Sequence, residues 1–569
     1  MKKYIPSLEW LRHYRKSWLS GDISAGLTVG VMLIPQGMAY SMLAGLPPIY
    51  GLYTVTLPLI LYAMLGTSRQ LAVGPVAMVS LLIFSGISQF AAPESENYIQ
   101  MAILLALMVG IMQLSMGVLK LGFLVNFLSH PVISGFTSAA AVIIGTSQLK
   151  HLLGIKVEGE RFIELVQQIF SKIHEFHNIS LIIGIASISM LVAIRKWNKK
   201  FPGALIVVIS GILAVYFNQW HLEGVKIVGK IPEGLPSFSL PQLNLDNLQN
   251  LLPTALTIAL VGFMESIAVA KAMHLRHKSY HLDADQELRA LGIANIAGAF
   301  FKSFPVTGGF SRTAVNNQAG AHTGLASLIS ASLIILTLLF FTPLFYYLPN
   351  AVLAAIILVA VYGLIDTHEF RHLWKTDKTD FTLFTIAAAG TLIMGIEEGI
   401  IIGVLLSIGL LVYRVSYPHF AELGYLKDYE EFRNISRFPN AVKEDEIVIF
   451  RFDAQLFFAN ANYFKDNLYH IIRHRRHPKF VIVQASGITS IDSSAVHMLD
   501  DLIKDLGEKG ITLLFSDMIG PFRDKFIQSG LAHKIGKKHC FTNLHDAYEY
   551  AKGKGCAPDE NIALQHFLD

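Results

Sequence analysis

Charged residues are scarce in this chain: Asp, Glu, Lys and Arg make up 15% of its 569 residues, while hydrophobic residues make up 53%. A soluble globular protein has roughly 25% charged residues, so that class is excluded as the default. Residues 23–68 and 313–365 contain no charged side chain at all. Each stretch is long enough for two membrane spans of about 20 residues. The sequence therefore predicts a protein that crosses a membrane several times.

Cysteine is almost absent, since the chain has only Cys540 and Cys556, both in its polar C-terminal part. This count makes a disulfide framework unlikely, and a cytosolic location suits that part of the chain. The N-terminal residues are basic and aromatic, and they lack the short apolar core of a cleaved signal peptide. The net charge of +4 gives no reason to expect a nucleic-acid partner.

The apolar part of the chain also lacks the residue patterns of an enzyme. It contains no cluster of metal ligands and no nucleophile with a partnered base. It has no large external domain that would capture a ligand. We therefore expect no catalytic residues, no metal and no cofactor, and a membrane enzyme or receptor is only a minor alternative.

Apolar runs separated by short polar turns occupy the chain up to Tyr413, and beyond Tyr417 the sequence becomes charged and mixed. This change predicts an N-terminal segment at 1–20, a transmembrane domain at 21–416 and a cytoplasmic domain at 417–569. We predict fourteen spans, at residues 23–42, 48–66, 71–88, 99–119, 131–149, 178–195, 203–218, 250–271, 287–301, 308–317, 321–346, 350–366, 380–396 and 398–415.

The charges before the first span predict the orientation of the chain in the membrane. Lys2, Lys3, Arg12, Arg15 and Lys16 precede this span. The positive-inside rule places such an end in the cytoplasm. An even number of spans returns the C-terminal domain to the same side. We therefore expect a multi-pass protein of the cell (inner) membrane, with both termini in the cytoplasm.

Two apolar segments, LAVGPVAMVS in the first half and SFPVTGGFSR in the second, are interrupted by proline and glycine. A matched pair of broken helices is a strong sequence indication of a transporter binding site. Their Pro-Val pairs, which begin at Pro75 and Pro305, are 230 residues apart. Gln36 and Glu265, polar residues inside the first span of each half, are 229 residues apart. These offsets predict an internal repeat of about seven spans.

A helix that begins in mid-membrane leaves its first backbone N–H groups without partners, unless they face a cavity or a ligand. Two such helix starts favour an anion, and Arg312 adds a positive charge that must face the interior or water. Glu265 either pairs with Arg312 or takes up a cation with the substrate. Two alternatives remain: Gln36 hydrogen-bonds a neighbouring helix, and Glu265 with Arg312 forms a structural ion pair.

The run PPIYGLYTVTLPLILYAMLGTSRQLAVGP (47–75) closely resembles the signature region of the SulP sulfate permease family. The resemblance continues through IPQGMAYSMLAGLPP, LSHPVISGFTSAAA, VGFMESIAVAKA and GGFSRTAVNNQAGA, and so covers essentially the whole chain. It implies a homodimer of fourteen-span subunits with seven-plus-seven inverted repeats, arranged as a core and a gate domain. It also implies elevator-type movement of the core, with the substrate between the third and tenth spans.

The same resemblance implies roles for particular residues. Glu265 matches an acidic position that prokaryotic relatives use for proton or sodium coupling. The substrate-binding positions that it implies are Gln36, Tyr40, Val76, Ala77, Ser311 and Arg312.

The polar C-terminal part has three short β-rich runs, at 446–453, 479–486 and 511–517, with helical stretches between and after them. This pattern predicts strands covered by helices on one side. The region resembles a STAS domain, similar to bacterial anti-sigma-factor antagonists, and the resemblance implies Ser493 and Ser494 as possible phosphorylation sites. Ala495 replaces the glycine of the antagonist motif. The alternative for both serines is ordinary capping of a helix N-terminus.

We predict secondary active transport of a small anion, by default sulfate, coupled to a proton or sodium ion. Bicarbonate and small dicarboxylates are alternative substrates, since each suits two helix N-termini and an arginine. A different class, the anion-conducting channel, also uses a selective pore. Paired broken helices favour a site with alternating access over a continuous pathway.

Overall fold

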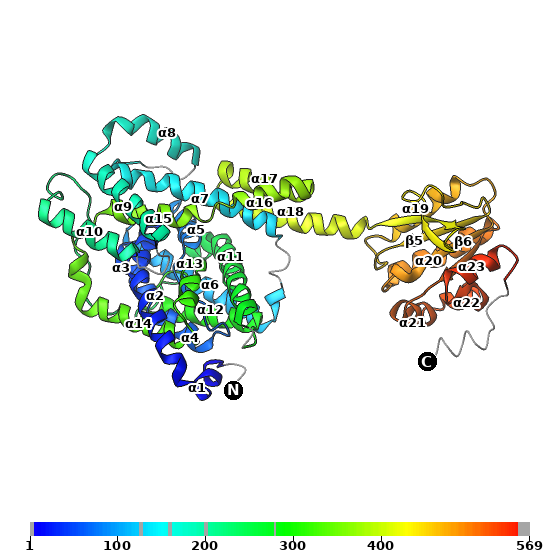
Figure 1. Ribbon diagram of the computed structural model, residues 1–569, viewed down its shortest axis with the longest axis horizontal. Helices are drawn as coiled ribbons and strands as arrows, with labels where there is room; N and C mark the ends of the chain where they lie inside the picture. The colour runs from blue at the N-terminus through cyan, green and yellow to red at the C-terminus, as the bar shows by residue number, and fades with distance from the viewer. Residues whose placement is uncertain (1–4, 124–128, 158–161, 198–202, 278–279, 556–569) are drawn as a thin grey trace. The chain divides into compact units, whose positions relative to one another are not determined.

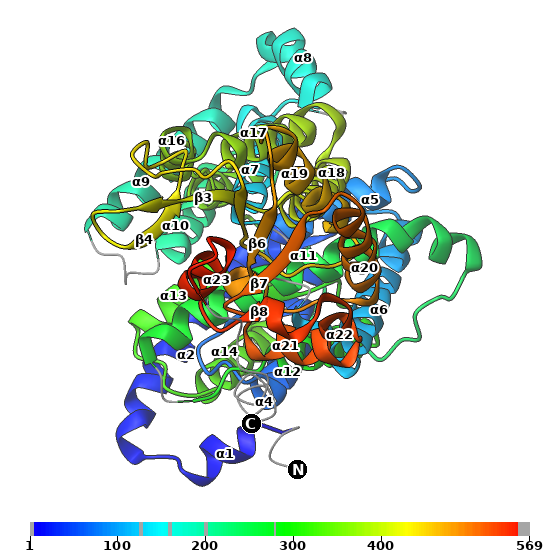
Figure 2. The ribbon, with the colours of Figure 1, turned by 90° about the vertical axis from the view of Figure 1, so that its right-hand side faces the viewer.

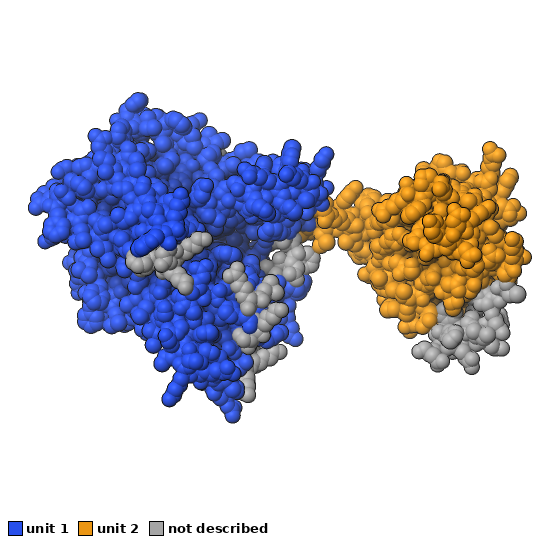
Figure 3. Space-filling view, in the orientation of Figure 1, with its two compact units in different colours: residues 1–407 blue, residues 408–569 orange. Residues whose placement is uncertain are grey.

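The computed structural model describes residues 5–123, 129–157, 162–197, 203–277 and 280–555. The chain divides into two compact units, residues 1–407 and residues 408–569 (Figure 3). The division falls inside α18 (Ile396–Ser416), the helix that contains the last predicted span. Each unit has its own hydrophobic core.

Apolar helices build unit 1 (Figure 1). Among the described residues, eight helical segments are long and apolar enough to cross a membrane, and three further apolar helices are shorter. Each predicted span contains at least one helix, so the predicted helical membrane fold is confirmed. In chain order these helices are α2 (Lys16–Leu43), α3 (Pro48–Thr54) with α4 (Leu57–Leu65), α5 (Ala77–Ser88), α6 (Glu96–Val118), α7 (His130–Leu153), α9 (Asn178–Trp197), α10 (Gly203–Asn218), α11 (Leu245–His277), α12 (Ala284–Ala299), α13 (Phe310–Gln318), α14 (Leu325–Leu336), α15 (Asn350–Tyr362), α17 (Lys378–Met394) and α18.

The structure differs from the predicted series of spans in two respects. It contains three short helices that carry charged residues and that hydropathy does not detect: α1 (Ser7–Arg12), α8 (Phe162–Lys172) and α16 (Thr367–Thr376). The second predicted span is also broken between α3 and α4. Pro58, in the first turn of α4, has no N–H to donate to the preceding turn, so the helical hydrogen bonds stop there.

The packing of unit 1 relates its two halves. The fourth span of the first half, α6, packs against α11 and α12, the first two spans of the second half. The fourth span of the second half, α14, packs against α2 and α4, the first two spans of the first half. Gly110 and Gly292 allow α6 and α12 to approach closely, since a Cβ at either glycine would lie 2.8 Å from the carbonyl oxygen of the other. An internal repeat predicts this reciprocal arrangement.

Two fully buried carboxylates fix loops of unit 1. Glu287, on α12, accepts hydrogen bonds from Tyr62 Oη and from Thr67 N and Oγ1, each at 2.6 Å, and from Ser68 N at 3.0 Å. Asp22, on α2, accepts from Thr323 N at 3.0 Å and from Thr323 Oγ1 at 2.7 Å. Buried charge is costly unless it is fully hydrogen-bonded, and these contacts supply that compensation. The loops after α4 and α13 are therefore anchored to helices distant in sequence.

We expect Glu287→Ala to lower the stability of unit 1 by roughly 3 kcal/mol, because it leaves four donors, two of them buried and two part-buried, without their acceptor. The measurement is the melting temperature of the detergent-solubilised protein, followed by fluorescence-detected size exclusion. Glu164→Ala, at an exposed position on α8, is the matched control. Equal melting temperatures for the two variants would contradict the anchoring role of Glu287.

Unit 2 contains a mixed six-stranded sheet in the order β4-β3-β5-β6-β7-β8. Strands β5, β6, β7 and β8 are parallel, whereas β3 pairs antiparallel with both β4 and β5. The three predicted strands correspond to β5, β6 and β7, and the other three were not predicted. The bounds are β3 (Phe420–Leu426), β4 (Glu431–Asn434), β5 (Ile447–Phe452), β6 (Phe480–Gln484), β7 (Thr512–Ser516) and β8 (Cys540–Phe541).

Helices cover both faces of this sheet, as Figure 2 shows for α23 (Leu544–Ala551) on one side and α20 (Ser493–Glu508) on the other. Phe450 and Phe515 point toward α19 (Ala461–Arg473), α20, α21 (Gly520–Gln528) and α22 (Leu531–Ile535). Ile482 and Leu514, on the opposite face, pack against Tyr548 of α23. The prediction of helices on one side only is therefore wrong. The central strands have apolar side chains on both faces of the sheet, so helices must pack against each face to keep these side chains from water.

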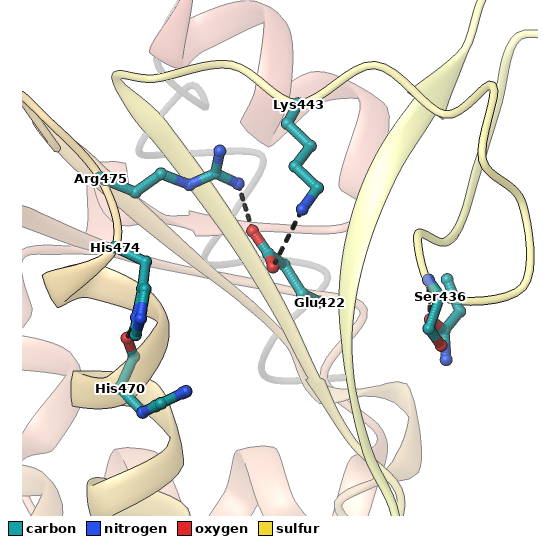
Figure 4. Close-up of polar contacts among 7 residues, drawn as sticks. Glu422, Ser436, Lys443, His470, His474 and Arg475 are labelled. Atoms are coloured by element: carbon teal, nitrogen blue, oxygen red, sulfur yellow. Dashed lines mark hydrogen bonds and ion pairs between the residues drawn. The ribbon is translucent and has the colours of Figure 1, made fainter.

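An ion-pair cluster joins strand β3 to the segment that follows α19. Glu422, on β3, pairs with Arg475 and, at 3.9 Å, with Lys443 (Figure 4). His474, the residue directly before Arg475, contacts the carbonyl oxygen of His470, one turn earlier, through its Nδ1 at 2.7 Å. The cluster fixes the antiparallel strand β3 against a helix of the parallel part of the sheet.

Candidate functional site

The two interrupted segments meet as a two-stranded antiparallel ribbon. β1 (Val73–Gly74) pairs with β2 (Thr307–Gly308), and Gly309 N donates to Ala72 O at 3.0 Å. Helix α5 begins directly after β1, and α13 begins directly after β2. Neither helix has a side-chain cap at its N-terminus. Two uncapped helix starts therefore lie beside one ribbon, where their N–H groups and positive dipole ends attract negative charge.

Proline and glycine residues explain why the chain adopts this local structure. The ring of Pro75 disfavours the helical conformation for Gly74, the residue before it, so the helix begins after the proline. A Cβ on Gly308 would lie 2.7 Å from Leu71 Cδ1. Glycine is therefore required there for the close approach of the two segments.

The register of the two segments differs from the predicted one. Val76 is the N-cap residue of α5, and Gly309 is the N-cap residue of α13. Pro305 instead precedes β2, so the two Pro-Val pairs do not occupy equivalent positions. The offset of 230 residues therefore does not relate structurally equivalent positions. The second segment has additional extended residues between its proline and its helix start.

Arg312 lies in the first turn of α13 and is 2% exposed. Its Nη1 donates to Pro75 O at 2.6 Å, across the ribbon. Its Nε and Nη2 are buried and have no hydrogen-bond partner among the residues that the structure describes. A buried guanidinium with two unused donors beside two helix N-termini has the chemistry to accommodate an anionic ligand.

Glycine leaves the room that the guanidinium of Arg312 occupies. A Cβ at Gly309 would lie 2.7 Å from Arg312 Nη2 and 2.8 Å from its Cζ. A Cβ at Gly74 would lie 3.4 Å from the same Nη2. The absence of side chains at Gly74 and Gly309 therefore leaves the space in which the Arg312 guanidinium packs.

Gly309→Ala is expected to reduce transport strongly while the protein still folds, because the added methyl group displaces the Arg312 guanidinium. Uptake by purified protein in liposomes measures the effect. Gly507→Ala is the control, since a Cβ at Gly507 in α20 meets no atom within 4 Å. Equal uptake by the two variants would show that the position of the guanidinium is unimportant.

Polar side chains that the sequence analysis did not select hold the ribbon to its neighbours. Asn295, on α12, accepts from Val306 N at 2.7 Å and donates to Val306 O at 3.2 Å. Ser266, on α11, accepts from Gly308 N at 2.7 Å. In the sequence, each of these two residues is a single polar residue within an apolar span. Such residues are too common in membrane helices to identify a functional site.

A cavity of about 860 Å³ lies in unit 1 between helices of both halves. Gln36, Glu265 and Ser311 line it, together with Met78 and Phe310. Glu265 Oε2 has no hydrogen-bond partner among the described residues. The cavity thus brings together three of the predicted site residues, one of which is a carboxylate with an unpartnered oxygen among the described residues.

The other predicted residues are buried and do not line this cavity. They are Tyr40, Val76, Ala77 and Arg312, at 7%, 6%, 6% and 2% exposure. Tyr40, Glu265 and Arg312 are close enough to interact electrostatically. Arg312 bonds to Pro75, and no bond between Arg312 and Glu265 is present. Arg312 therefore lies near Glu265 but behind the surface that lines the cavity.

Ser493 and Ser494 begin α20 in unit 2, and both are exposed. Asp492 is the cap: its Oδ1 accepts from Ala495 N at 2.8 Å and its Oδ2 from Phe458 N at 3.0 Å. The two hydroxyl groups are accessible to an enzyme, and the regulatory role of these serines stays a prediction.

A helical membrane unit, with a largely apolar cavity that a few polar side chains line beside two broken helices, defines the class of polytopic membrane transporters. Residues 19–387 match the sulfate permease family, and residues 438–547 match the STAS domain. The chain belongs to the sulfate permease family, whose members are transporters and not enzymes.

Relatives over the full chain agree with this assignment. "Sulfate transporter 4.1, chloroplastic" of Arabidopsis thaliana is 41% identical over 96% of this chain and 82% of its own length. A probable sulfate transporter of Mycobacterium tuberculosis is 33% identical over 96% of this chain and 98% of its own. The fold is similar to that of the murine Solute Carrier 26 family member A9 anion transporter in the inward-facing state, with a TM-score of 0.90 at 24% identity over 97% of this chain and 94% of that chain.

Proposed function

We propose that this protein is a secondary active transporter of a small anion, and that sulfate is its substrate. The observation that carries the proposal is the pair of uncapped helix starts beside the buried Arg312, whose Nε and Nη2 have no partner among the described residues. This arrangement attracts an anion through fixed dipoles and one full charge. Sulfate follows from the names of the relatives, not from the size of the cavity.

The anion would bind between α5 and α13. Backbone N–H groups at Ala77 and Ser311 would donate to it, with the Ser311 hydroxyl, and Val76 would set the direction of α5. Gln36 and Tyr40, on α2, would complete the polar contacts from the opposite side. The unused donors of Arg312 support this assignment, because a bound oxyanion would accept from them.

Glu265 would couple transport to a proton or sodium ion. Its Oε2 faces no hydrogen-bond donor among the described residues, and it lines the same cavity as Ser311. A carboxylate in that position neutralises its charge by binding a cation. Uptake of the anion then draws on the gradient of that cation.

Movement of a core domain past a gate domain would carry the anion across. The lining of the cavity includes His130 and Arg195, at the ends of α7 and α9, and Asp366, at the end of the segment between α15 and α16. If each predicted span crosses the membrane once, these ends lie on the same side as the start of α2. The cavity would then open to the cytoplasm, in a conformation like the inward-facing state named for the murine neighbour.

We further propose a homodimer in the inner membrane, with both termini cytoplasmic and unit 2 as a regulatory domain open to phosphorylation at Ser493 and Ser494. Phosphate at the start of α20 would be stabilised by the helix dipole. Cross-linking of the purified protein would measure the dimer.

Uptake of labelled anions into proteoliposomes tests the proposed function. Sulfate, bicarbonate, chloride and a dicarboxylate are compared under imposed proton and sodium gradients. We expect saturable sulfate uptake that one of the two gradients drives. Steady single-channel conductance with no gradient-driven accumulation would assign the chain to the channel class instead.

A further inference from the structure

The segment between α10 and α11 carries exposed apolar side chains. Between Glu233 and Asp246 it contains no charged residue. Its large apolar side chains are unusually exposed: Leu235 49%, Phe238 65%, Leu240 72%, Leu243 71% and Leu245 76%. Each apolar Å² left in water costs about 25 cal/mol, and soluble surfaces avoid such a continuous series. The segment is therefore adapted to an apolar environment.

Hydrogen bonds to unit 1 fix the conformation of this segment. Gly229 N donates to Tyr346 O at 3.0 Å, Gly234 N to Leu338 O at 2.9 Å, and Ser239 N to Phe300 O at 2.9 Å. The Phe238 and Phe300 rings stack at 5.8 Å between centroids, with an angle of 5° between their planes. The backbone of the segment is thus fixed by hydrogen bonds, and its apolar side chains point outward from it.

The exposed series continues onto a membrane helix. Leu245 is the first residue of α11, and Leu252 and Leu256 follow on the same face at seven and eleven residues, with exposures of 52% and 50%. α11 is one of the helices long and apolar enough to cross a membrane. An apolar surface that is continuous with a membrane span lies in the bilayer, and this continuity identifies lipid as what covers it.

Tyrosines and a cavity mark the other end of the segment. Tyr347 contacts Tyr216 and Tyr346, with ring centroids at 5.2 Å and 4.9 Å. Tyr346 and Tyr347 line a cavity of about 910 Å³ together with Lys230 and Glu233. Tyrosine is enriched at the headgroup level of membranes, and a lysine there is placed to bind a lipid phosphate.

We propose that residues 230–245 lie in the membrane interface, with Leu235, Phe238, Leu240 and Leu243 among the acyl chains and with Lys230 bound to the phosphate of a phospholipid. The bound lipid is adjacent to the turn at Tyr346 and Tyr347, which leads into α15. This site is distinct from the anion cavity and does not depend on the transported substrate.

An environment-sensitive fluorophore at a single cysteine tests the position of the segment. The full chain carries Cys540→Ala and Cys556→Ser, with Leu240→Cys or Leu243→Cys labelled with nitrobenzoxadiazole, in phosphatidylcholine liposomes. Tyr429→Cys is the control, because Tyr429 is 74% exposed in unit 2. We expect blue-shifted emission at 240 and 243, strong quenching by lipids spin-labelled near the glycerol backbone, and weak quenching by iodide. The control shows the reverse.

Two results would overturn the interfacial position. Iodide quenching equal to that of the control places the segment in water. Protection from both quenchers places it against protein, as in a contact between two copies of the chain. Leu240 and Leu243 are both exposed, so failure of one variant to fold leaves the other for the test.

Native mass spectrometry tests the phosphate contact. We expect Lys230→Glu to lose bound phospholipid that the parent protein retains, and Lys230→Arg to keep it, because arginine preserves the charge. Equal phospholipid occupancy in the parent protein, Lys230→Glu and Lys230→Arg would exclude Lys230 as the headgroup ligand.

Discussion

Arg312→Gln abolishes anion uptake while the protein remains folded: this is the largest effect that we expect from a single substitution. Glutamine removes the full positive charge that Arg312 places beside the helix starts of α5 and α13. Losing a charged contact to a desolvated anion costs about 3 kcal/mol, which raises the Kd about a hundredfold. Labelled-sulfate binding and proteoliposome uptake measure the two consequences separately.

Two variants make the Arg312 result interpretable. Arg312→Lys keeps the charge and loses the second donor arm, so an intermediate affinity is expected. Arg195→Gln removes an exposed arginine at the mouth of the cavity and is expected to change uptake only slightly. If a folded Arg312→Gln variant bound sulfate with the affinity of the wild-type protein, the charge of Arg312 would have no role in anion binding.

Glu265→Gln is expected to abolish gradient-driven accumulation and to spare exchange of anion for anion. The amide has nearly the same shape as the carboxylate, so the cavity is preserved, but it does not take up a proton and has no negative charge to balance a sodium ion. Net accumulation under a proton or sodium gradient measures the coupled reaction. Counterflow between labelled and unlabelled anion measures transport without coupling.

Glu369→Gln is the matched control for this pair of measurements. Glu369 is also a carboxylate of unit 1, at 15% side-chain exposure and 3.8 Å from His130. It does not line the cavity, so both reactions should persist in the variant. Unchanged gradient-driven accumulation in Glu265→Gln would refute the coupling role.

The helices of unit 1 were predictable because the membrane imposes length and hydropathy on every span. Short helices with charged residues, such as α8 and α16, carry neither signal. The break between α3 and α4 has Pro58 as its cause, yet proline also occurs within continuous helices such as α2. Strand β3 was missed because it is stabilised by pairing with β5, beyond an intervening strand, and β4 was missed because it is short and pairs with β3.

The candidate site was predictable in its residue types but not in its geometry. Proline and glycine indicated both helix breaks, and intramembrane charge indicated Glu265 and Arg312. The bond from Arg312 to Pro75 joins opposite halves of the chain, so no spacing in the sequence reveals it. The same holds for Asn295, whose importance follows only from its bonds to Val306.

The β1–β2 ribbon has a consequence for biosynthesis. The first half of the chain is translated and inserted before Thr307 and Gly308 are synthesised. Until then, the backbone groups of Val73 and Gly74 lack the partners that they have in the folded protein. Water or the insertion machinery has to shelter them until the ribosome has delivered the second half. A ribosome stalled before residue 307 would therefore hold an immature chain without a transport site, however well its first helices have entered the bilayer.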